Sequence, residues 1–186
     1  MKRILFILLV AMYSFAVYAQ QTAKDYIGTW KYEKEDTVFT IRLIKGEAFY
    51  KGKPKAEIDE ELIFGGYSLS VKNKMVENYI TDINTKWVYE NINGGEQHIY
   101  IYGACNTRYK GKKGIGFKFY DQRMKHFNGE GIWGGTLEPI GPNKLHWTLN
   151  EKEGIWWETE GLEDWVEVKP IGFSVPTDVI MTKVDE

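Results

Sequence analysis

The chain has 186 residues, with 24 Lys and Arg against 26 Asp and Glu, and a single Cys. The near-neutral charge excludes a polybasic surface for nucleic acid or lipid headgroups. One Cys excludes an intrachain disulfide framework and an all-cysteine metal site. Aromatic residues make up 15% of the chain and 19 residues are Gly, a composition typical of a folded, turn-rich domain.

The first 19 residues have the pattern of a secretory signal peptide. Lys2 and Arg3 precede an apolar run, and small residues lead up to Ala19, after which we expect cleavage. The apolar run, residues 4–19, has 16 residues, fewer than the about 20 that a membrane-spanning helix needs. We therefore expect an exported protein, periplasmic or extracellular. Cleavage leaves one domain over residues 20–186, without stable insertion in a membrane.

After the predicted cleavage site, apolar residues recur with a period of two, as on β-strands. Phe39, Ile41 and Leu43, for example, fall on one face of the first long run. One short helical turn is expected over residues 23–26, and no segment of ten residues or more has a helical stripe. The alternating runs predict strands over residues 37–44, 61–64, 67–71, 86–90, 98–102, 115–120, 131–137, 144–149, 154–158 and 179–183.

Segments rich in Gly and Asn separate these runs and predict hairpin turns. They are residues 51–54, 65–66, 93–95, 128–129 and 141–143. About ten short strands joined by tight turns predict an all-β sandwich or barrel. We favour a single antiparallel up-and-down β-barrel of about 8–10 strands, because closure removes exposed sheet edges.

The start of the first strand resembles that of the lipocalin-like (calycin) barrels. Gly28-Thr29-Trp30 has the Gly-x-Trp pattern that these barrels carry at this position. In that family the Trp closes the bottom of the barrel and packs against a basic residue of the last strand. Lys183 has a comparable position near the end of this chain. The resemblance implies a lipocalin-like barrel.

A second resemblance covers most of the mature chain. Residues 28–31, 36–41, 143–149 and 173–183 are similar to an uncharacterised family of small exported bacterial β-proteins, a domain of unknown function. The ending, Pro176-Thr177 before a short apolar strand that finishes Thr182-Lys183, is the most specific element. This resemblance implies an exported β-protein and offers no catalytic residue.

The acidic segment 57–61 is the strongest enzyme-like feature. Glu57, Asp59 and Glu61 alternate like the carboxylates of the β-jelly-roll glucanases. Glu60, however, places a fourth charge where those enzymes have apolar residues, so we expect a solvated acidic edge. The Gly-rich residues 111–116 precede a strand rather than the helix that a phosphate loop needs, and therefore predict a turn.

No pattern predicts a metal or a cofactor. His98, His126 and His146 are too widely spaced to form a motif. Cys105, at the end of an apolar run, is expected to be a buried inert thiol, with pairing between chains or a role as a reactive nucleophile as the alternatives. We therefore expect a protein that is not an enzyme.

The most informative pattern is the spread of aromatic residues over different predicted strands. A small barrel either fills its interior with such side chains or leaves room for one ligand. We hypothesise an exported, non-catalytic binding protein that holds a small apolar or aromatic molecule within the barrel. The interior candidates are Trp30, Trp87, Tyr89, Tyr100, Tyr102, Trp133 and Trp147.

An alternative function uses the outer surface. Trp156, Trp157 and Trp165 lie close together in the sequence beside several carboxylates. Exposed Trp rings can stack on sugars or contact another protein. The alternative hypothesis is therefore a carbohydrate- or protein-binding β module with no interior ligand.

Overall fold

The computed structural model describes residues 22–50, 53–54, 60–80, 88–89, 99–106, 114–161 and 168–184. The predicted signal peptide lies outside the described residues, as do most of the acidic segment 57–61 and the predicted turn at 93–95. Among the described residues, none forms a helix with the length and apolar character needed to cross a membrane.

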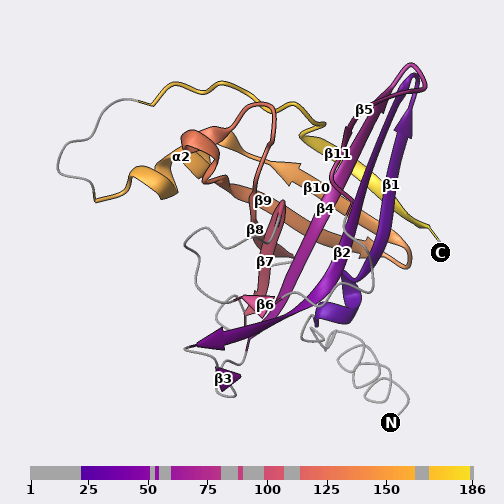
Figure 1. The fold of residues 1–186 in the computed structure, drawn as a ribbon. Coiled ribbons are helices and arrows are strands. Elements are labelled where there is room, and N and C mark those ends of the chain that lie inside the picture. Colours follow the sequence, from indigo (N-terminus) through magenta and orange to yellow (C-terminus); the bar gives the residue numbers. More distant parts are fainter. Residues whose placement is uncertain are drawn as a thin grey trace, which may run out of the picture.

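Eight antiparallel strands form one closed barrel (Figure 1), as the sequence predicts. Each strand pairs with the next around the barrel, and the last pairs with the first: Thr29 lies opposite Val184. In order around the barrel the strands are β1 (Gly28–Lys34), β2 (Thr37–Tyr50), β4 (Glu60–Val71), β7 (Ile101–Asn106), β8 (Ile115–Phe119), β9 (Ile132–Gly141), β10 (Lys144–Leu149) and β11 (Asp178–Val184).

Short elements extend this barrel. A further strand, β5 (Lys74–Asn78), pairs with the second half of β4, and β3 (Lys53–Pro54) and β6 (Val88–Tyr89) pair with the end of β2. The 3-10 helix η1 (Ala23–Asp25) confirms the short turn predicted before the first strand. The predicted hairpin turn at 141–143 is also confirmed, between β9 and β10.

The predicted turn at Gly65-Gly66 is wrong, because β4 runs through it as one strand from Glu60 to Val71. A side chain at Gly65 would overlap the carbonyl oxygen of Arg42 on β2, so the glycine is needed for close approach of two strands. The neighbour of β4 also changes here. Residues up to Gly65 pair with β7, and residues from Ser68 pair with β5.

The strand predicted over residues 154–158 is also wrong, because this segment belongs to α-helix α2 (Glu151–Thr159). The cap explains the helix: the side chain of Asn150 accepts a hydrogen bond of 3.3 Å from the backbone N–H of Glu153. Two Glu side chains in the first turn further favour a helix here, since its N-terminus is electropositive.

Helix α2 packs on the outside of β9 through a glycine contact. Gly154 is buried, and a side chain there would overlap the carbonyl oxygen of Trp133. The helix and strand backbones therefore touch directly. Lys118 of β8 and Glu158 of the helix add an ion pair with a separation of 2.9 Å.

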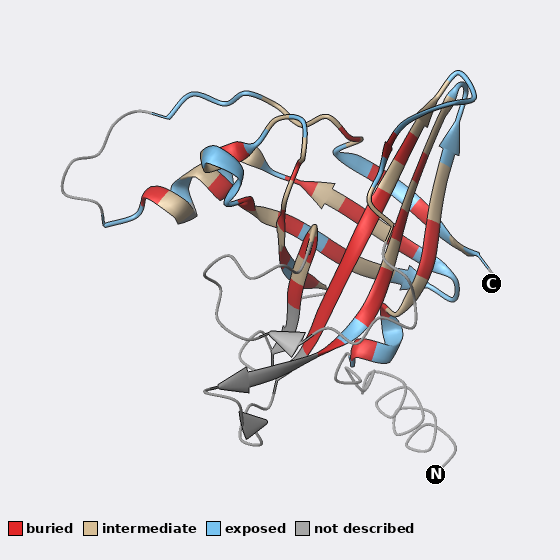
Figure 2. Ribbon diagram, in the orientation of Figure 1, coloured by how far each residue is buried: buried red, intermediate tan, exposed pale blue. Residues whose placement is uncertain are grey.

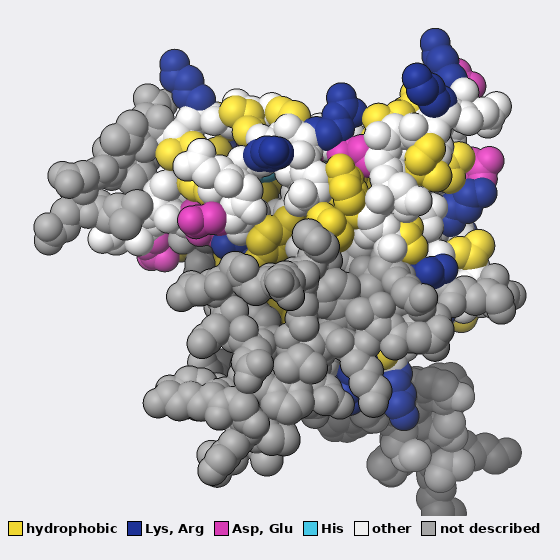
Figure 3. Space-filling model, in the orientation of Figure 1, with side chains coloured by type: hydrophobic (Ala, Val, Ile, Leu, Met, Phe, Trp, Pro, Cys, Tyr) yellow, Lys and Arg dark blue, Asp and Glu magenta, His cyan; other side chains and the backbone are white. Residues whose placement is uncertain are grey.

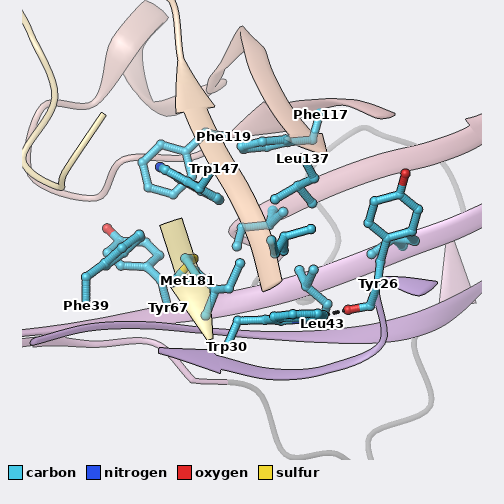
Figure 4. Packing of buried hydrophobic residues seen from close by; sticks show 14 of the residues in the cluster. Tyr26, Trp30, Phe39, Leu43, Tyr67, Phe117, Phe119, Leu137, Trp147 and Met181 are labelled. Atoms are coloured by element: carbon cyan, nitrogen blue, oxygen red, sulfur yellow. Dashed lines mark hydrogen bonds between the residues drawn. The ribbon is translucent and has the colours of Figure 1, made fainter. Parts of the chain in front are cut away.

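Buried residues recur along the described strands of the barrel (Figure 2), and their side chains pack against one another in its interior (Figure 4). Trp147 is fully buried at the centre of this core. Its ring centre lies 4.6 Å from that of Phe117, 5.4 Å from Phe39 and 5.5 Å from Phe119. Rings from β2, β8 and β10 therefore meet in the middle of the barrel.

Candidate functional site

One end of the barrel, which we call the closed end, is sealed by η1 and by Trp30. The Trp30 side chain is 2% exposed, and its indole N–H donates a 2.7 Å hydrogen bond to the Tyr26 carbonyl oxygen. The Lys183 Nζ atom lies 5.3 Å from the centre of the Trp30 ring. The Trp and the basic residue of the last strand thus meet as the lipocalin-like resemblance implies.

The opposite end, which we call the mouth, is covered by residues 168–177, which we call the strap (Figure 1). Trp147 donates its indole N–H to the Pro176 carbonyl oxygen at 2.9 Å. Val175 is buried in the core cluster, and the Phe173 ring lies 6.2 Å from that of Phe119. The strap therefore rests directly on the aromatic core.

Glu151 provides the first polar attachment of the strap. Its carboxylate accepts hydrogen bonds from the backbone N–H groups of Ile171 (2.6 Å) and Gly172 (2.9 Å). The φ angle of Gly172, +82°, turns the backbone so that successive N–H groups reach the same carboxylate. Nε2 of the buried His126 lies 3.1 Å from the same Glu151 side chain, and the His126 ring packs against Phe173.

Ser174 provides the second attachment, to two buried carboxyl groups. Its backbone N–H donates a 2.7 Å hydrogen bond to Asp121, and its hydroxyl lies 2.8 Å from Asp121 Oδ1 and 3.1 Å from Glu77 Oε2. Glu77 is 4% exposed and Asp121 is 2% exposed. Burial raises the pKa of Glu77 above its ordinary value, and the neighbouring Asp121 charge adds to this effect.

Three tyrosine rings connect the core to the rim of the mouth. Tyr67 is fully buried, whereas Tyr79 and Tyr100 are half-buried. The Tyr79 and Tyr100 ring centres lie 4.8 Å apart, and Tyr67 lies 5.3 Å from Tyr79 and 6.1 Å from Tyr100. Burial raises the pKa of both Tyr67 and Tyr100, so these phenols stay neutral.

The loop over residues 121–131, which we call the mouth loop, carries unusual backbone conformations. Lys125, Phe127 and Asn128 have φ angles of 51°, 50° and 57°, each in the region that favours glycine. The turn predicted at Asn128-Gly129 is therefore not a hairpin: it lies within the 3-10 helix η3 (His126–Gly129). The other described non-glycine residues with positive φ sit in hairpin turns.

The predicted interior residues divide between three places. Trp30 and Trp147 lie in the core, and Tyr100 lies at the mouth. The interior placement of Tyr102 and Trp133 is wrong, because both lie on the outer face. Trp87 and the side chain of Tyr89 lie outside the described residues.

Strand alternation explains the outward position of Tyr102. The buried Ile101 and Gly103 face inward, so Tyr102 points out and stacks on Phe64 with ring centres 5.7 Å apart. Trp133 meets the other side of Tyr102 at 5.9 Å. Tyr100 contacts the core because it lies at a bend just before β7 begins, where the alternation is broken.

Of the predicted surface residues, Trp156 is described completely, and its side chain on α2 is 54% exposed. The side chain of Trp157 and all of Trp165 lie outside the described residues. Basic, acidic and apolar side chains are mixed over the described part of the face shown in Figure 3, in keeping with the near-neutral composition.

The structure assigns structural partners to two of the histidines. His126 joins the strap attachment at Glu151, and His146 Nε2 lies 2.7 Å from Asp178 on the neighbouring strand. Among the described residues, no three His, Cys, Asp or Glu side chains are arranged to hold a metal ion. The side chains of Glu61 and Cys105 lie outside this part, as do Glu57, Asp59 and His98.

The mouth residues Glu77, Asp121, Glu151 and Ser174 were not predicted from the sequence. They come from β5, the mouth loop, α2 and the strap, and Glu77 and Ser174 are 97 positions apart. A motif search inside one segment cannot find such a group. One local signal was available: the Asp121 side chain accepts backbone N–H bonds two and three residues ahead, a common Asp turn.

The fold and its sealed core define a small, closed, antiparallel β-barrel with a covered mouth. The chain belongs to a family of unknown function (DUF6705), whose model matches residues 1–184. No curated protein and no solved structure matches the chain.

Proposed function

We propose that this protein is a non-catalytic binding protein that holds a small apolar or aromatic molecule at the mouth of the barrel. The mouths of β-barrels are common binding sites for small molecules. The packed side chains around Trp147 occupy the middle of the barrel. A ligand therefore lies nearer the rim than the sequence hypothesis placed it.

The tyrosine stack is the observation that carries this proposal. Tyr79 and Tyr100 are half-buried and rest on the fully buried Tyr67. Such a stack offers a flat ligand a rigid aromatic surface, with phenol groups to orient it. Because Tyr67 is fixed by the core and by the Gln122 backbone N–H at 3.1 Å, the surface is ordered before a ligand arrives.

The backbone of the mouth loop supports the same location. Non-glycine residues in the left-handed region cost about 1–3 kcal/mol each. They persist where the surrounding structure holds them, and they cluster at ligand sites. Three such residues, Lys125, Phe127 and Asn128, lie at the mouth.

A binding experiment with matched tyrosine variants tests the proposal. Full-length protein is titrated with fatty acids and aromatic metabolites, and binding is followed by ligand-observed NMR and calorimetry. We expect a saturable ligand whose Kd rises about tenfold in Tyr79→Leu or Tyr100→Leu, since an aromatic stacking pair contributes about 0.5–1.5 kcal/mol beyond its buried area.

The control variant is Tyr102→Leu, because Tyr102 is also half-buried but lies on the outer face of the same wall. Its Kd should stay within about twofold of wild type. Equal losses in all three folded variants, or no binding across the panel, would contradict a site at the mouth.

The exposed Trp156 favours a second candidate, a carbohydrate- or protein-binding surface on α2. At 54% exposure its ring is accessible to a sugar or a partner protein. Titration with soluble oligosaccharides separates the two functions. A response that Trp156→Ala abolishes and Tyr100→Leu leaves unchanged supports the surface module.

We also propose that the protein is exported, on the basis of the signal-peptide pattern of residues 1–19. Mass spectrometry of protein recovered outside the cytoplasm should show a mature chain that begins at Gln20. Recovery of only the intact chain from the cytoplasm would contradict export.

A further inference from the structure

The hydroxyl group of Ser174 lies between two buried carboxyl groups. Its Oγ atom is 2.8 Å from Asp121 Oδ1 and 3.1 Å from Glu77 Oε2. A hydroxyl group has one hydrogen and can donate it to one acceptor. Both oxygen–oxygen contacts can be full hydrogen bonds only if one of the two carboxyl groups carries a hydrogen of its own.

The other bonds of the cluster assign this hydrogen to Glu77. Asp121 already accepts the backbone N–H groups of Arg123 (3.0 Å), Met124 (2.9 Å) and Ser174 (2.7 Å). Asp121 thus acts as the acceptor in each of these bonds. It also accepts the Ser174 hydroxyl hydrogen, because its oxygen lies closer to Ser174 Oγ (2.8 Å) than the Glu77 oxygen does (3.1 Å). A hydrogen carried by Glu77 can then be donated to the Ser174 oxygen across the longer contact of 3.1 Å.

The groups facing Glu77 come from three elements. Tyr67 on β4 donates to Glu77 Oε1 at 3.4 Å, Asp121 and Arg123 face it from the mouth loop, and Ser174 faces it from the strap. The Arg123 charge and the hydrogen bonds favour the carboxylate. Burial and the Asp121 charge oppose it, and they prevail: the pKa of Glu77 is raised.

We propose that the strap is a proton-dependent lid, which stays closed over the mouth while Glu77 carries a hydrogen and loosens when Glu77 ionises. An ionised Glu77 would leave the single Ser174 hydrogen between two carboxylates. The two buried negative charges would then repel each other, with one hydroxyl hydrogen to share between them.

The strap, rather than the barrel wall, is the part that moves when Glu77 ionises. Residues 168–171 are exposed, and residues 171–174 are held by the carboxyl groups of Glu151, Glu77 and Asp121, whereas the backbone bond from Leu149 to Thr177 continues the β10–β11 pairing. Loss of the Ser174 attachment therefore leaves the strand pairings of the barrel intact. Opening uncovers the ends of Phe119 and Trp147. The lid is a property of the strap itself and does not depend on the proposed ligand.

The direction of the pH dependence follows from linkage. A carboxyl group with a raised pKa in the closed state binds its proton more tightly there than in the open state. Its contribution to closure is fully present below the ordinary carboxyl pKa, about 4.3. This contribution is lost as the pH rises through the raised pKa of Glu77.

Hydrogen exchange at the strap tests the lid in the ligand-free, full-length protein. Gly172 and Ser174 donate their amide hydrogens to Glu151 and Asp121, so their protection reports closure directly. Protection factors, corrected for intrinsic exchange, are measured from about pH 4 to about pH 9, the range that buried carboxyl groups span. We expect protection at these amides to fall by up to tenfold per pH unit between the ordinary carboxyl pKa and the raised pKa of Glu77, and to level off above it, while core amides stay protected.

The decisive variant is Glu77→Gln, whose neutral amide can donate to Ser174 at every pH. Protection of Gly172 and Ser174 should then be independent of pH. The control is Glu158→Gln, which removes a carboxyl group from the ion pair with Lys118 outside the barrel. It should keep the wild-type pH dependence.

Flat protection in the wild type, or the same fall in Glu77→Gln, would overturn the lid. Should Glu77→Gln not fold, carbon-13 NMR of the wild-type carboxyl groups decides the question. Titration of Glu77 in step with the loss of strap protection supports the proposal. Titration at the ordinary Glu pKa overturns it.

Discussion

The two ends of the barrel are sealed by different chemistry. At the closed end, Trp30 is anchored to Tyr26, four residues earlier in the chain, and lies under Lys183 of the last strand. At the mouth, the strap is attached through Glu77, Asp121 and Ser174, which come from distant parts of the chain. The first seal is mainly apolar and close to η1. The second depends on buried carboxyl groups.

This difference separates global stability from local opening. Removing a buried ring takes apolar surface and packing from the whole cooperative unit. Removing a buried polar attachment at the mouth frees the strap, whose residues 168–171 are already exposed. Variants at the closed end should therefore lower the free energy of unfolding of the whole barrel, whereas variants at the mouth should mainly loosen the strap. Three variants test this comparison.

The largest effect is expected for Trp30→Ala at the closed end. Loss of a large buried aromatic side chain lowers the free energy of unfolding by about 3–5 kcal/mol. Urea denaturation followed by circular dichroism measures this change. Trp156→Ala is the control, because its exposed ring should contribute within about 0.5 kcal/mol. Similar losses in both variants would contradict a special role for Trp30.

An intermediate effect, confined to the mouth, is expected for Asp121→Asn. Both oxygens of the Asp121 carboxylate accept hydrogen bonds, but an Asn amide has a single accepting oxygen. One of the partners Ser174, Arg123 and Met124 is therefore left unsatisfied, at a cost of about 1–3 kcal/mol. Relative to wild type, we expect the variant to accelerate hydrogen exchange at the Ser174 amide more than at the core amides. Asp178→Asn, which changes an exposed carboxylate, serves as the control. Equal acceleration at all amides would mean that the strap does not open separately from the barrel.

The smallest effect is expected for Lys183→Met at the closed end. The methionine keeps the apolar stem that covers Trp30 but loses the charge above the ring. A partly exposed cation–π contact contributes about 0.5–1 kcal/mol, and Lys183→Arg should retain it. Chemical denaturation of the three proteins side by side measures the difference. A Met variant as stable as wild type would show that packing alone seals this end.

Much of the barrel wall could be predicted from the sequence, because strand alternation is a local signal. Phe39, Ile41 and Leu43 face the core as their spacing predicts. The contact of Trp30 with Lys183 followed from the lipocalin-like resemblance. The turn predicted at Gly65-Gly66 failed because Gly65 serves the close approach of two strands in the folded barrel.

The remaining differences arise from contacts that no short segment contains. The apolar residues of 154–158 are compatible with a strand or a helix. The Asn150 side chain stabilises the helix, because it accepts a hydrogen bond from the backbone N–H of Glu153. Tyr102 was expected inside although its neighbours Ile101 and Gly103 take the inward positions. The mouth cluster was missed because Glu77, Asp121 and Ser174 meet only after the barrel has closed.

The pairing of the first strand with the last has a consequence for how the protein is made. Thr29 and Val184 lie opposite each other across the ladder that joins β1 to β11. A chain that leaves a ribosome or a translocation channel cannot complete this ladder until its final strand has emerged. Until then β1 and β10 both present unpaired edges, which are the surfaces through which β-proteins aggregate. The newly made chain therefore depends on rapid completion, or on a chaperone that covers these two strands.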